Sequence, residues 1–362
     1  MGPAPCAGSL CSSFLPPESQ APGPEQALAN GRWVKVIGGA SNQDLEALED
    51  LAGLFSLAGV HCLDVAADVA VVAATRRGIR WALDRGAPSS PWLMVSLSDG
   101  ADPHFRKAWF DPCRCPPHCP RPCERVCPAL AIPAGAGVLV ERCYGCGRCL
   151  PACPHGLIVE HQHVLQAEAV APLLRELQPD AVEIHTRIGR HLSFSQRVAQ
   201  LKESGVPLRR VAVSCGLEPP ETVETLAASL WRRHQRLRQE GFLPLWQLDG
   251  RPMSGDVGAG TAHAAVQLLD RLRSLAPPGP LQLAGGTNLS TLPLLQRRAE
   301  ASRVAAGVAF GGVARSLLQD LLQEARRRSC RVLDSKDLWP RGLTLARSLV
   351  QPWLLRSPAS AR

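Results

Sequence analysis

The residues with the clearest chemical potential are cysteines, and they are concentrated in one part of the chain. Nine of the fourteen cysteines lie within the 41 residues 113–153. In a small secreted protein such a cluster would indicate disulfides, but this chain has 362 residues and shows no export signal at its proline-dotted N-terminus. The clustering therefore predicts metal binding.

The downstream half of this segment reads Cys143-x2-Cys146-x2-Cys149-x3-Cys153-Pro154. Gaps of two residues let three thiolates turn around one iron–sulfur cluster. The fourth cysteine, followed by proline, ligates the other cluster in two-cluster ferredoxins. The spacing therefore requires a second cysteine motif.

The upstream half supplies that motif and also ends in Cys-Pro, at Cys127-Pro128. We expect one cluster, called cluster 2, on Cys127, Cys143, Cys146 and Cys149. The other, cluster 1, is expected on Cys115, Cys119, Cys123 and Cys153, with Cys113 as the alternative to Cys115. Both are expected to be [4Fe–4S], although the wider upstream gaps leave [3Fe–4S] open for cluster 1.

Zinc is the alternative metal, since it also takes four thiolates at C-x2-C spacing. It would leave the three-cysteine turn and the two Cys-Pro ends unexplained, so we expect iron–sulfur. Residues 101–155 also contain seven Lys or Arg against four acids. These cations would nearly neutralise two clusters and ease their reduction, unless the arginines simply face water.

Glycine-rich turns form a second candidate site, for a flavin or another phosphate. Gly285 and Gly286 follow one predicted strand, and Gly311 and Gly312 follow the next. In barrels, turns at these places bind phosphate because backbone N–H groups and a helix N-terminus face the anion. The alternative is that the glycines only allow tight turns.

A third group of polar residues follows the fourth predicted strand, on the side where the cysteine segment is expected. It consists of His185, Arg187, Arg190 and His191. These side chains could bind an anion or a quinone head group, or they could be an ordinary polar loop.

The elements that must position these groups follow a repeating pattern. Eight short apolar runs occur at residues 34–40, 62–67, 92–97, 181–186, 210–216, 244–250, 281–286 and 304–312. Segments with helical spacing separate them, for example residues 44–58, 195–204, 222–240, 262–275 and 291–302. Fully apolar strands alternating with helices predict a parallel sheet, and eight such units predict a (β/α)8 barrel. An open doubly wound sheet is the alternative, but no Gly-x-Gly-x-x-Gly fingerprint opens the domain.

The expected organisation places the cysteine segment as an insertion in this barrel. Residues 1–31 are expected to be a disordered arm, 32–98 the first βα units, 99–166 the ferredoxin-like insertion, 167–345 the remaining barrel and 346–362 a tail. An insertion between the third and fourth strands emerges at the carboxyl ends of the strands, the face on which barrels build their active sites.

Composition narrows the classes of function. The chain is 45% hydrophobic and 20% charged, as in an ordinary globular protein. Its formal charge of +8 invites a nucleic-acid function, but the basic residues are scattered and the chain has one tyrosine and seven phenylalanines to stack on bases. We expect no nucleic-acid binding, no membrane span and a cytoplasmic location.

Several segments together resemble the cyanobacterial light-dependent period (LdpA) family. They are Trp33-Val-Lys-Val-Ile-Gly-Gly-Ala40, Cys119-Pro-Arg-Pro-Cys123-Glu-Arg-Val-Cys127-Pro128, Cys143-Tyr-Gly-Cys146-Gly-Arg-Cys149, Ala181-Val-Glu-Ile-His185 and Gly285-Gly286-Thr287-Asn288. The resemblance implies a redox-responsive iron–sulfur protein that feeds light or metabolic state into the circadian clock. Its implied partners are a clock input kinase and core clock proteins.

We therefore expect a redox sensor or electron-transfer protein without a catalytic residue of its own, exchanging electrons with a quinone or an electron carrier. The alternative is an iron–sulfur flavin-dependent oxidoreductase with the flavin at the four glycines. A radical enzyme that cleaves S-adenosylmethionine is disfavoured because the chain has no Cys-x3-Cys-x2-Cys run.

Overall fold

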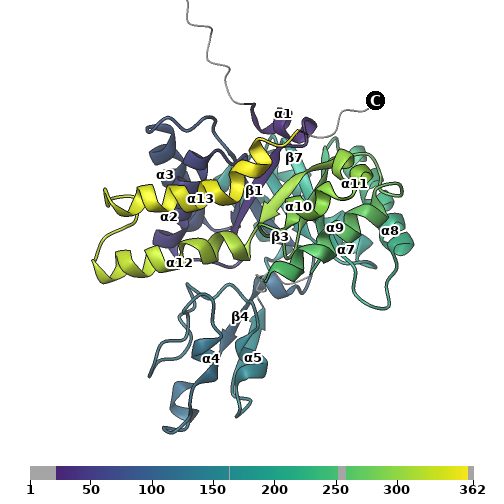
Figure 1. Ribbon diagram of the computed structural model, residues 1–362. Helices are drawn as coiled ribbons and strands as arrows, with labels where there is room; N and C mark the ends of the chain where they lie inside the picture. Colours follow the sequence, from purple (N-terminus) through teal and green to yellow (C-terminus); the bar gives the residue numbers. More distant parts are fainter. Residues whose placement is uncertain (1–21, 163, 252–257, 358–362) are drawn as a thin grey trace, which may run out of the picture.

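The computed structural model describes residues 22–162, 164–251 and 258–357. Its main body is a barrel of strands surrounded by helices (Figure 1). The barrel is closed, with eight parallel strands in the order β1-β10-β9-β8-β7-β6-β3-β2. The strands are β1 (Trp33–Gly39), β2 (Cys62–Ala66), β3 (Trp92–Ser98), β6 (Ala181–His185), β7 (Arg210–Gly216), β8 (Pro244–Asp249), β9 (Leu281–Ala284) and β10 (Ala305–Phe310). The predicted (β/α)8 barrel is confirmed over the open sheet, and each barrel strand overlaps a predicted apolar run.

Helices surround the barrel, as the pattern predicts. They are α2 (Leu45–Ala58), α3 (Val69–Leu83), α6 (Ala167–Leu177), α7 (His191–Ser204), α8 (Val223–Gln239), α9 (Ala262–Leu272), α10 (Thr291–Gln296), α11 (Ala299–Val304), α12 (Gly312–Arg327) and α13 (Leu338–Leu354), with a short turn η3 (Ala259–Thr261) before α9. The helix predicted over residues 291–302 is two helices. The break between α10 and α11 falls at Arg298, whose guanidinium pairs with Asp270 on α9.

The expectation of a disordered arm over residues 1–31 is wrong for its last part, because α1 (Pro24–Ala29) is helical. Leu28 on α1 packs into an apolar layer with Trp33, Trp92 and Met94, at the end of the barrel where its strands begin. This helix has six residues, and only Ala27 and Leu28 are buried. Two neighbouring buried residues cannot show the apolar periodicity by which a helix is recognised in a sequence. Residues 1–21 lie outside the described residues.

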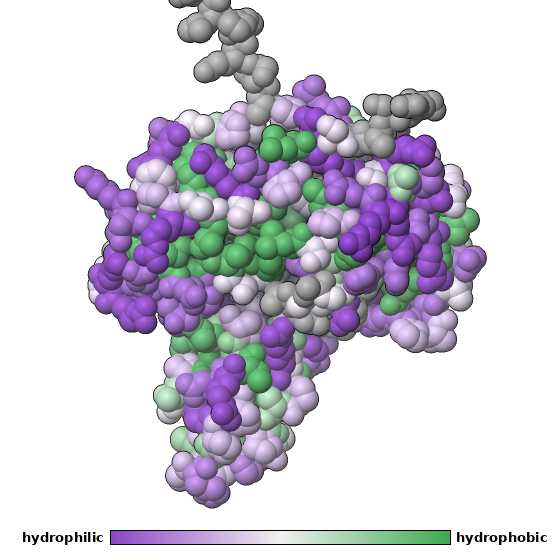
Figure 2. All heavy atoms as spheres, viewed as in Figure 1, coloured by the Kyte–Doolittle hydropathy of each residue, from purple (hydrophilic) through white to green (hydrophobic). Residues whose placement is uncertain are grey.

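The expectation of a tail over residues 346–362 is also wrong for its first part, because α13 continues to Leu354, and residues 358–362 lie outside the described residues. Pro340 lies in the first turn of α13, where no N–H partner is lost, and Pro352 lies within three residues of its end. Ala346, Leu349 and Trp353 are buried against the barrel helices. On the face seen in Figure 2, apolar side chains lie in a groove between α12 and α13.

The cysteine segment forms a lobe between β3 and β6, at the end of the barrel opposite α1 (Figure 1). Two antiparallel strands, β4 (Arg106–Trp109) and β5 (Val159–Gln162), connect the lobe to the barrel. Its short helices are η1 (Pro103–Phe105), η2 (Pro112–Arg114), α4 (Pro122–Arg125) and α5 (Cys149–Ala152). The lobe has a small core that contains Phe110, Ala131, Ile132 and Ile158. Three buried cysteines belong to the same core: Cys123, Cys143 and Cys149. The lobe therefore packs around its own cysteines.

The barrel interior changes from apolar to polar along the strands. Alternate residues of a strand point inward, and the first inward layer includes Trp33, Met94 and Leu245. The next layer is hydrogen-bonded and polar, and it contains Lys35, Asp64, Ser96, Glu183, Gln247 and Gln282. The polar layer lies at the end of the barrel that faces the lobe, so charged groups inside the barrel are on the same side as the cysteines.

Candidate functional site

The structure brings Cys127 of the upstream motif together with the three downstream cysteines. Burial raises the pKa of the Cys149 thiol to about 12, and the neighbouring thiols of Cys146, Cys127 and Cys143 raise it as well. Cys127 in turn interacts with Cys146 and Cys143. These four residues are the set that the sequence assigns to cluster 2.

The residues predicted for cluster 1 also come from both motifs. Burial raises the pKa of Cys123, and the thiol of Cys153 contributes to that rise. Cys115 interacts with both Cys119 and Cys123. Cys115 contacts the core of the lobe, whereas Cys113 is exposed. The structure thus groups the residues predicted for cluster 1, and their role as ligands stays a prediction.

The cysteine sets fit an iron–sulfur cluster better than zinc. Tetrahedral zinc, with Zn–S bonds of about 2.3 Å, would hold its sulfurs about 3.8 Å apart. Among the residues that the structure describes, no three cysteine sulfurs lie within 4.8 Å of one another. An iron–sulfur cluster carries its own sulfide and holds its thiolates farther apart than a single zinc ion does.

Backbone donors surround the sulfurs, as they do around thiolates that carry negative charge. The N–H of Ala108 lies 3.3 Å from Cys143 Sγ, and the N–H of Ala131 lies 3.3 Å from Cys127 Sγ. A third N–H, from Leu157, lies 3.4 Å from Cys153 Sγ. Such bonds stabilise thiolate ligands and tune the reduction potential of a bound cluster.

The loop of residues 143–149 packs directly on the barrel. The Arg315 guanidinium of α12 lies 4.2 Å from the centroid of the Tyr144 ring and also donates to the carbonyl of Ile37 at 2.8 Å. On the lobe side, Arg106 Nε donates to the carbonyl of Gly145 at 3.0 Å. One edge of the loop therefore contacts α12, whose Arg315 also binds β1, and the other edge contacts β4.

A buried ion-pair network lies beneath this loop, in the polar layer of the barrel. Lys35 Nζ lies 2.8 Å from Asp64 Oδ2 and also pairs with Glu183. Burial alone would lower the pKa of Lys35, but the two carboxylates raise it above its usual range. Glu183 also accepts a hydrogen bond of 2.7 Å from Gln247 Nε2.

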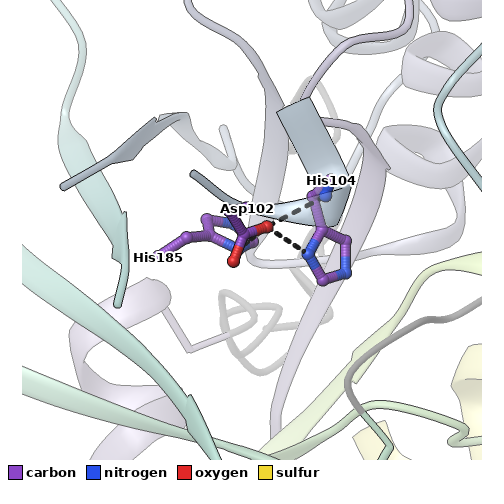
Figure 3. A group of neighbouring side chains, drawn as sticks. All are labelled: Asp102, His104 and His185. Atoms are coloured by element: carbon purple, nitrogen blue, oxygen red, sulfur yellow. Dashed lines mark hydrogen bonds and ion pairs between the residues drawn. The ribbon is translucent and has the colours of Figure 1, made fainter. Parts of the chain in front are cut away.

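Above this network, three ionisable residues meet at the barrel mouth (Figure 3). Asp102 Oδ1 lies 2.8 Å from His104 Nδ1 and 4.0 Å from His185 Nδ1. The other ring nitrogen of His185 lies 3.1 Å from Glu183 Oε1. Burial would lower the pKa of His185, but Glu183 and Asp102 raise it to about 9. Asp102 and Glu183 thus favour a positive charge on His185.

Of the polar residues predicted after the fourth strand, only His185 belongs to this group. Arg187 pairs with Glu218 at 3.0 Å, and Arg190 lies 3.4 Å from Asp99. His191 is exposed at the start of α7. Arg187 and His185 do line one cavity together, and anion or quinone binding there stays a prediction.

The four predicted glycines lie at two turns on the same side of the barrel. Gly285 and Gly286 have φ of +62° and +90°. A Cβ on Gly285 would lie 2.4 Å from the Arg251 carbonyl oxygen, so close packing alone accounts for that glycine. Gly311 and Gly312 lie at the start of α12. A flavin phosphate at these turns stays a prediction.

Sequence analysis missed Lys35, Asp64, Asp102 and His104. A signal for the first two was present, because each is one charged residue inside an apolar run that the barrel buries. No comparable signal marked Asp102 and His104, which lie in the connection between β3 and β4.

The fold and the site together define a class of protein: an iron–sulfur protein built on a parallel eight-stranded barrel. Two family models match the chain, the LdpA Fe-S cluster-binding domain over residues 115–164 and the Light dependent period A C-terminal domain over residues 173–352. Light dependent period A of Synechococcus elongatus is 44% identical over 333 residues, which cover 91% of this chain and 93% of that protein. The chain therefore belongs to the light-dependent period A family, as its motifs predicted.

Solved structures resemble the chain only remotely. Thiamine phosphate pyrophosphorylase from Pyrococcus furiosus is 9% identical with a TM-score of 0.39, covering 91% of this chain and all of its own. Geranylgeranylglyceryl phosphate synthase from Thermoplasma acidophilum is 10% identical with a TM-score of 0.35, covering 90% of this chain and 98% of its own.

No helix within the described ranges is both long enough and apolar enough to cross a membrane.

Proposed function

We propose that this protein is a cytoplasmic redox sensor that holds two [4Fe–4S] clusters and passes their redox state to clock proteins. The clusters would supply reversible one-electron chemistry, with each reduction adding one negative charge to the lobe. The residues of the chain bind the clusters, tune them and connect them to the barrel.

The interleaving of the two cysteine motifs is the observation that carries this proposal. The thiol of Cys127 acts electrostatically on Cys149 of the downstream motif, and the thiol of Cys153 acts on Cys123 of the upstream motif, which supports an exchange of one cysteine in each direction. Such an exchange of one cysteine in each direction is what two-cluster ferredoxins require. For the remaining ligand of cluster 1, Cys115 is favoured over Cys113, because Cys115 is half-buried and packs against the core of the lobe, whereas Cys113 is exposed.

The contacts of Tyr144 support sensing rather than electron transfer alone. Tyr144 lies next to Cys143, and its ring contacts the Arg315 guanidinium of α12. The backbone carbonyl of Glu141, two residues before Cys143, accepts a hydrogen bond of 2.8 Å from the N–H of Gln43, just before α2. A change of charge beside Tyr144 would therefore act on Arg315 and on two helices of the barrel surface, where a partner protein could bind.

A sensor is favoured over a flavin-dependent oxidoreductase by the size of the cavity at Gly285. The free volume there is about 40 Å³. Pockets for drug-sized ligands have volumes of about 300–1,000 Å³. The walls include Tyr144 and Cys146, so this small cavity lies beside residues of the loop assigned to cluster 2.

The first test is anaerobic purification with iron, sulfide, zinc and flavin quantified together, and electron paramagnetic resonance (EPR) recorded before and after dithionite. We expect about eight irons per chain, equal sulfide, no flavin and a reversible signal. Stoichiometric flavin would instead identify an oxidoreductase. Zinc without sulfide would rule out both functions.

Single cysteine variants test the ligand sets. Cys127→Ser should lose the same EPR signal as Cys143→Ser, although the two residues come from different motifs. Cys113→Ser is the matched control and should keep the full iron content. Equal loss of iron in Cys113→Ser and Cys115→Ser would contradict the assignment of cluster 1.

The proposed partners are a clock input kinase and core clock proteins. Their affinity for the purified protein should differ at least severalfold between the oxidised and the dithionite-reduced forms, as a sensor requires. Equal affinity in both forms would leave an iron–sulfur protein without a sensing role towards these partners.

A further inference from the structure

We propose that Asp102, His104 and His185 bind one divalent first-row transition-metal ion, of the Fe²⁺ or Mn²⁺ type, at the mouth of the barrel. This mononuclear site would be separate from the cysteine sets. It does not depend on the proposed sensing function.

The geometry of the three side chains is the first support (Figure 3). One candidate ligand atom from each residue lies within 4.8 Å of the other two. Asp102 Oδ1 is 2.8 Å from His104 Nδ1 and 4.0 Å from His185 Nδ1. Atoms that bind the same ion at about 2.1 Å lie about 3–4 Å apart. Two imidazoles and one carboxylate, with further positions open, are the ligands typical of non-haem Fe²⁺.

Neighbouring residues already hold the three side chains in place. Glu183 Oε1 lies 3.1 Å from His185 Nε2, so the opposite nitrogen, Nδ1, is left facing Asp102. Asp102 accepts a hydrogen bond of 2.9 Å from the N–H of His104, which fixes the loop at the start of η1. A carboxylate behind a ligating histidine is the usual arrangement that orients metal ligands and increases their basicity.

The charge balance also favours a cation at this place. The network connected to His185 contains the carboxylates of Asp64, Asp102, Glu183 and Asp249, and Lys35 is the buried lysine that pairs with two of them. Arg187, near the mouth, pairs with Glu218, whereas Arg251 and Arg315 line one of the two cavities there. Because Asp102 and Glu183 favour a proton on His185, binding would replace the Nδ1 proton by the ion, and the carboxylates that attract the proton would attract the ion as well.

There is room for an ion with its water ligands, but little more. Two cavities share His104, His185 and Asp249 as walls, and each has a free volume of about 40 Å³. A water molecule needs at least about 10–15 Å³ of such volume. The space therefore suits a metal ion with a few waters or a small oxygen ligand in its open positions. Cys146 lines one of these cavities, so the ion would lie near cluster 2.

The test uses the cluster-loaded protein in its oxidised form, because oxidised [4Fe–4S] clusters give no EPR signal that hides Mn²⁺. Mn²⁺ is added, and the decrease of its free six-line EPR signal is measured. We expect one Mn²⁺ per chain, with couplings to two ¹⁴N nuclei in the electron spin echo envelope modulation. Absence of binding, or bound Mn²⁺ without nitrogen couplings, would overturn the proposal.

Variants locate the ion. Asp102→Asn keeps an acceptor for the N–H of His104 but removes the charge, and His104→Gln removes one imidazole. Both should bind Mn²⁺ at least tenfold more weakly. The control is Asp68→Asn, because Asp68 also caps a helix, by accepting from the N–H of Val71 at 3.0 Å, but lies outside the site. Binding that is equal in all three variants would contradict the assignment.

Iron and sulfide are quantified in every sample. Loss of clusters with Mn²⁺ binding intact would contradict the two-cluster proposal alone. Intact clusters without Mn²⁺ binding would overturn the mononuclear site alone.

Discussion

The Arg315 guanidinium lies over the ring of Tyr144, 4.2 Å from its centroid, and it joins the loop between Cys143 and Cys146 to the first turn of α12. The same guanidinium donates to the carbonyl of Ile37 at 2.8 Å, at the mouth of the barrel. Charge in the lobe and the position of a barrel helix are therefore connected through one side chain.

Arg315→Met should shift one of the two cluster midpoint potentials to a more negative value. Removing a nearby positive charge disfavours the reduced, more negative cluster, and we expect a change on the order of tens of millivolts. An EPR-monitored redox titration measures it. Arg341→Met is the control, since Arg341 pairs with Glu324 on α12 and does not contact the loop. Equal shifts in both variants would show that Arg315 has no special connection to the cluster.

Gly145→Ala should cause loss of iron, whereas Gly135→Ala should not. Both glycines have a left-handed φ, of +73° and +74°, so each alanine substitution has the same backbone cost of about 1–2 kcal/mol. A Cβ on Gly145 would lie 2.3 Å from the Arg106 carbonyl oxygen, but a Cβ on Gly135 meets nothing within 4 Å. Iron and sulfide per chain after anaerobic purification distinguish the two. Full iron content in Gly145→Ala would mean that the loop and β4 can separate without harm to the site.

Lys35→Met should lower the free energy of unfolding by about 3–5 kcal/mol, because it leaves two buried carboxylates without their cation. Lys35 and Glu183 are fully buried, and Asp64 is 1% exposed. The control is Arg303→Met, which breaks an exposed pair with Glu300 and should cost less than about 1 kcal/mol. Urea unfolding under anaerobic conditions measures both. Similar costs for the two variants would mean that Asp64 and Glu183 take up protons or water easily.

His61 should make the protein less stable as the pH falls from 6.5 towards 4. Burial lowers the pKa of His61 from 6.5 to about 4, and its neutral Nδ1 accepts from the N–H of Val34 at 3.1 Å. Between these pH values the unfolded chain binds a proton that the folded chain does not, so stability is lost as acidity increases. The loss is about 3 kcal/mol over this window.

His61→Gln, which keeps a hydrogen-bond acceptor, should remove this part of the pH dependence. The measurement is the difference in unfolding free energy between the two proteins from pH 7 down to pH 5, with cluster absorbance followed in parallel. A pH dependence unchanged in His61→Gln would assign the acid sensitivity to other groups.

The barrel was predictable because its signals are local. Each strand is a short apolar run, and helices such as α2 and α8 show apolar residues at helical spacing within their own sequence. The segments that sequence analysis assigned wrongly are α1 and the last part of α13. In α1 the buried face is two residues long. In α13, Pro340 lies in the first turn, where a helix tolerates proline, but Pro352 lies inside the helix, where proline argues against helical structure.

The sequence by itself determined the eight-unit barrel, the position of the insertion and the family, because apolar period and cysteine spacing are properties of neighbouring residues. Only the tertiary structure decided which groups face one another inside the barrel. Lys35 and Glu183 are 148 positions apart, and they meet because alternate residues of β1 and β6 point into one closed interior. Asp102 reaches His185 because β3 and β6 are adjacent strands, although the whole cysteine lobe lies between them in the chain. Spacing along the chain cannot encode such pairs, since closure of the barrel brings them together.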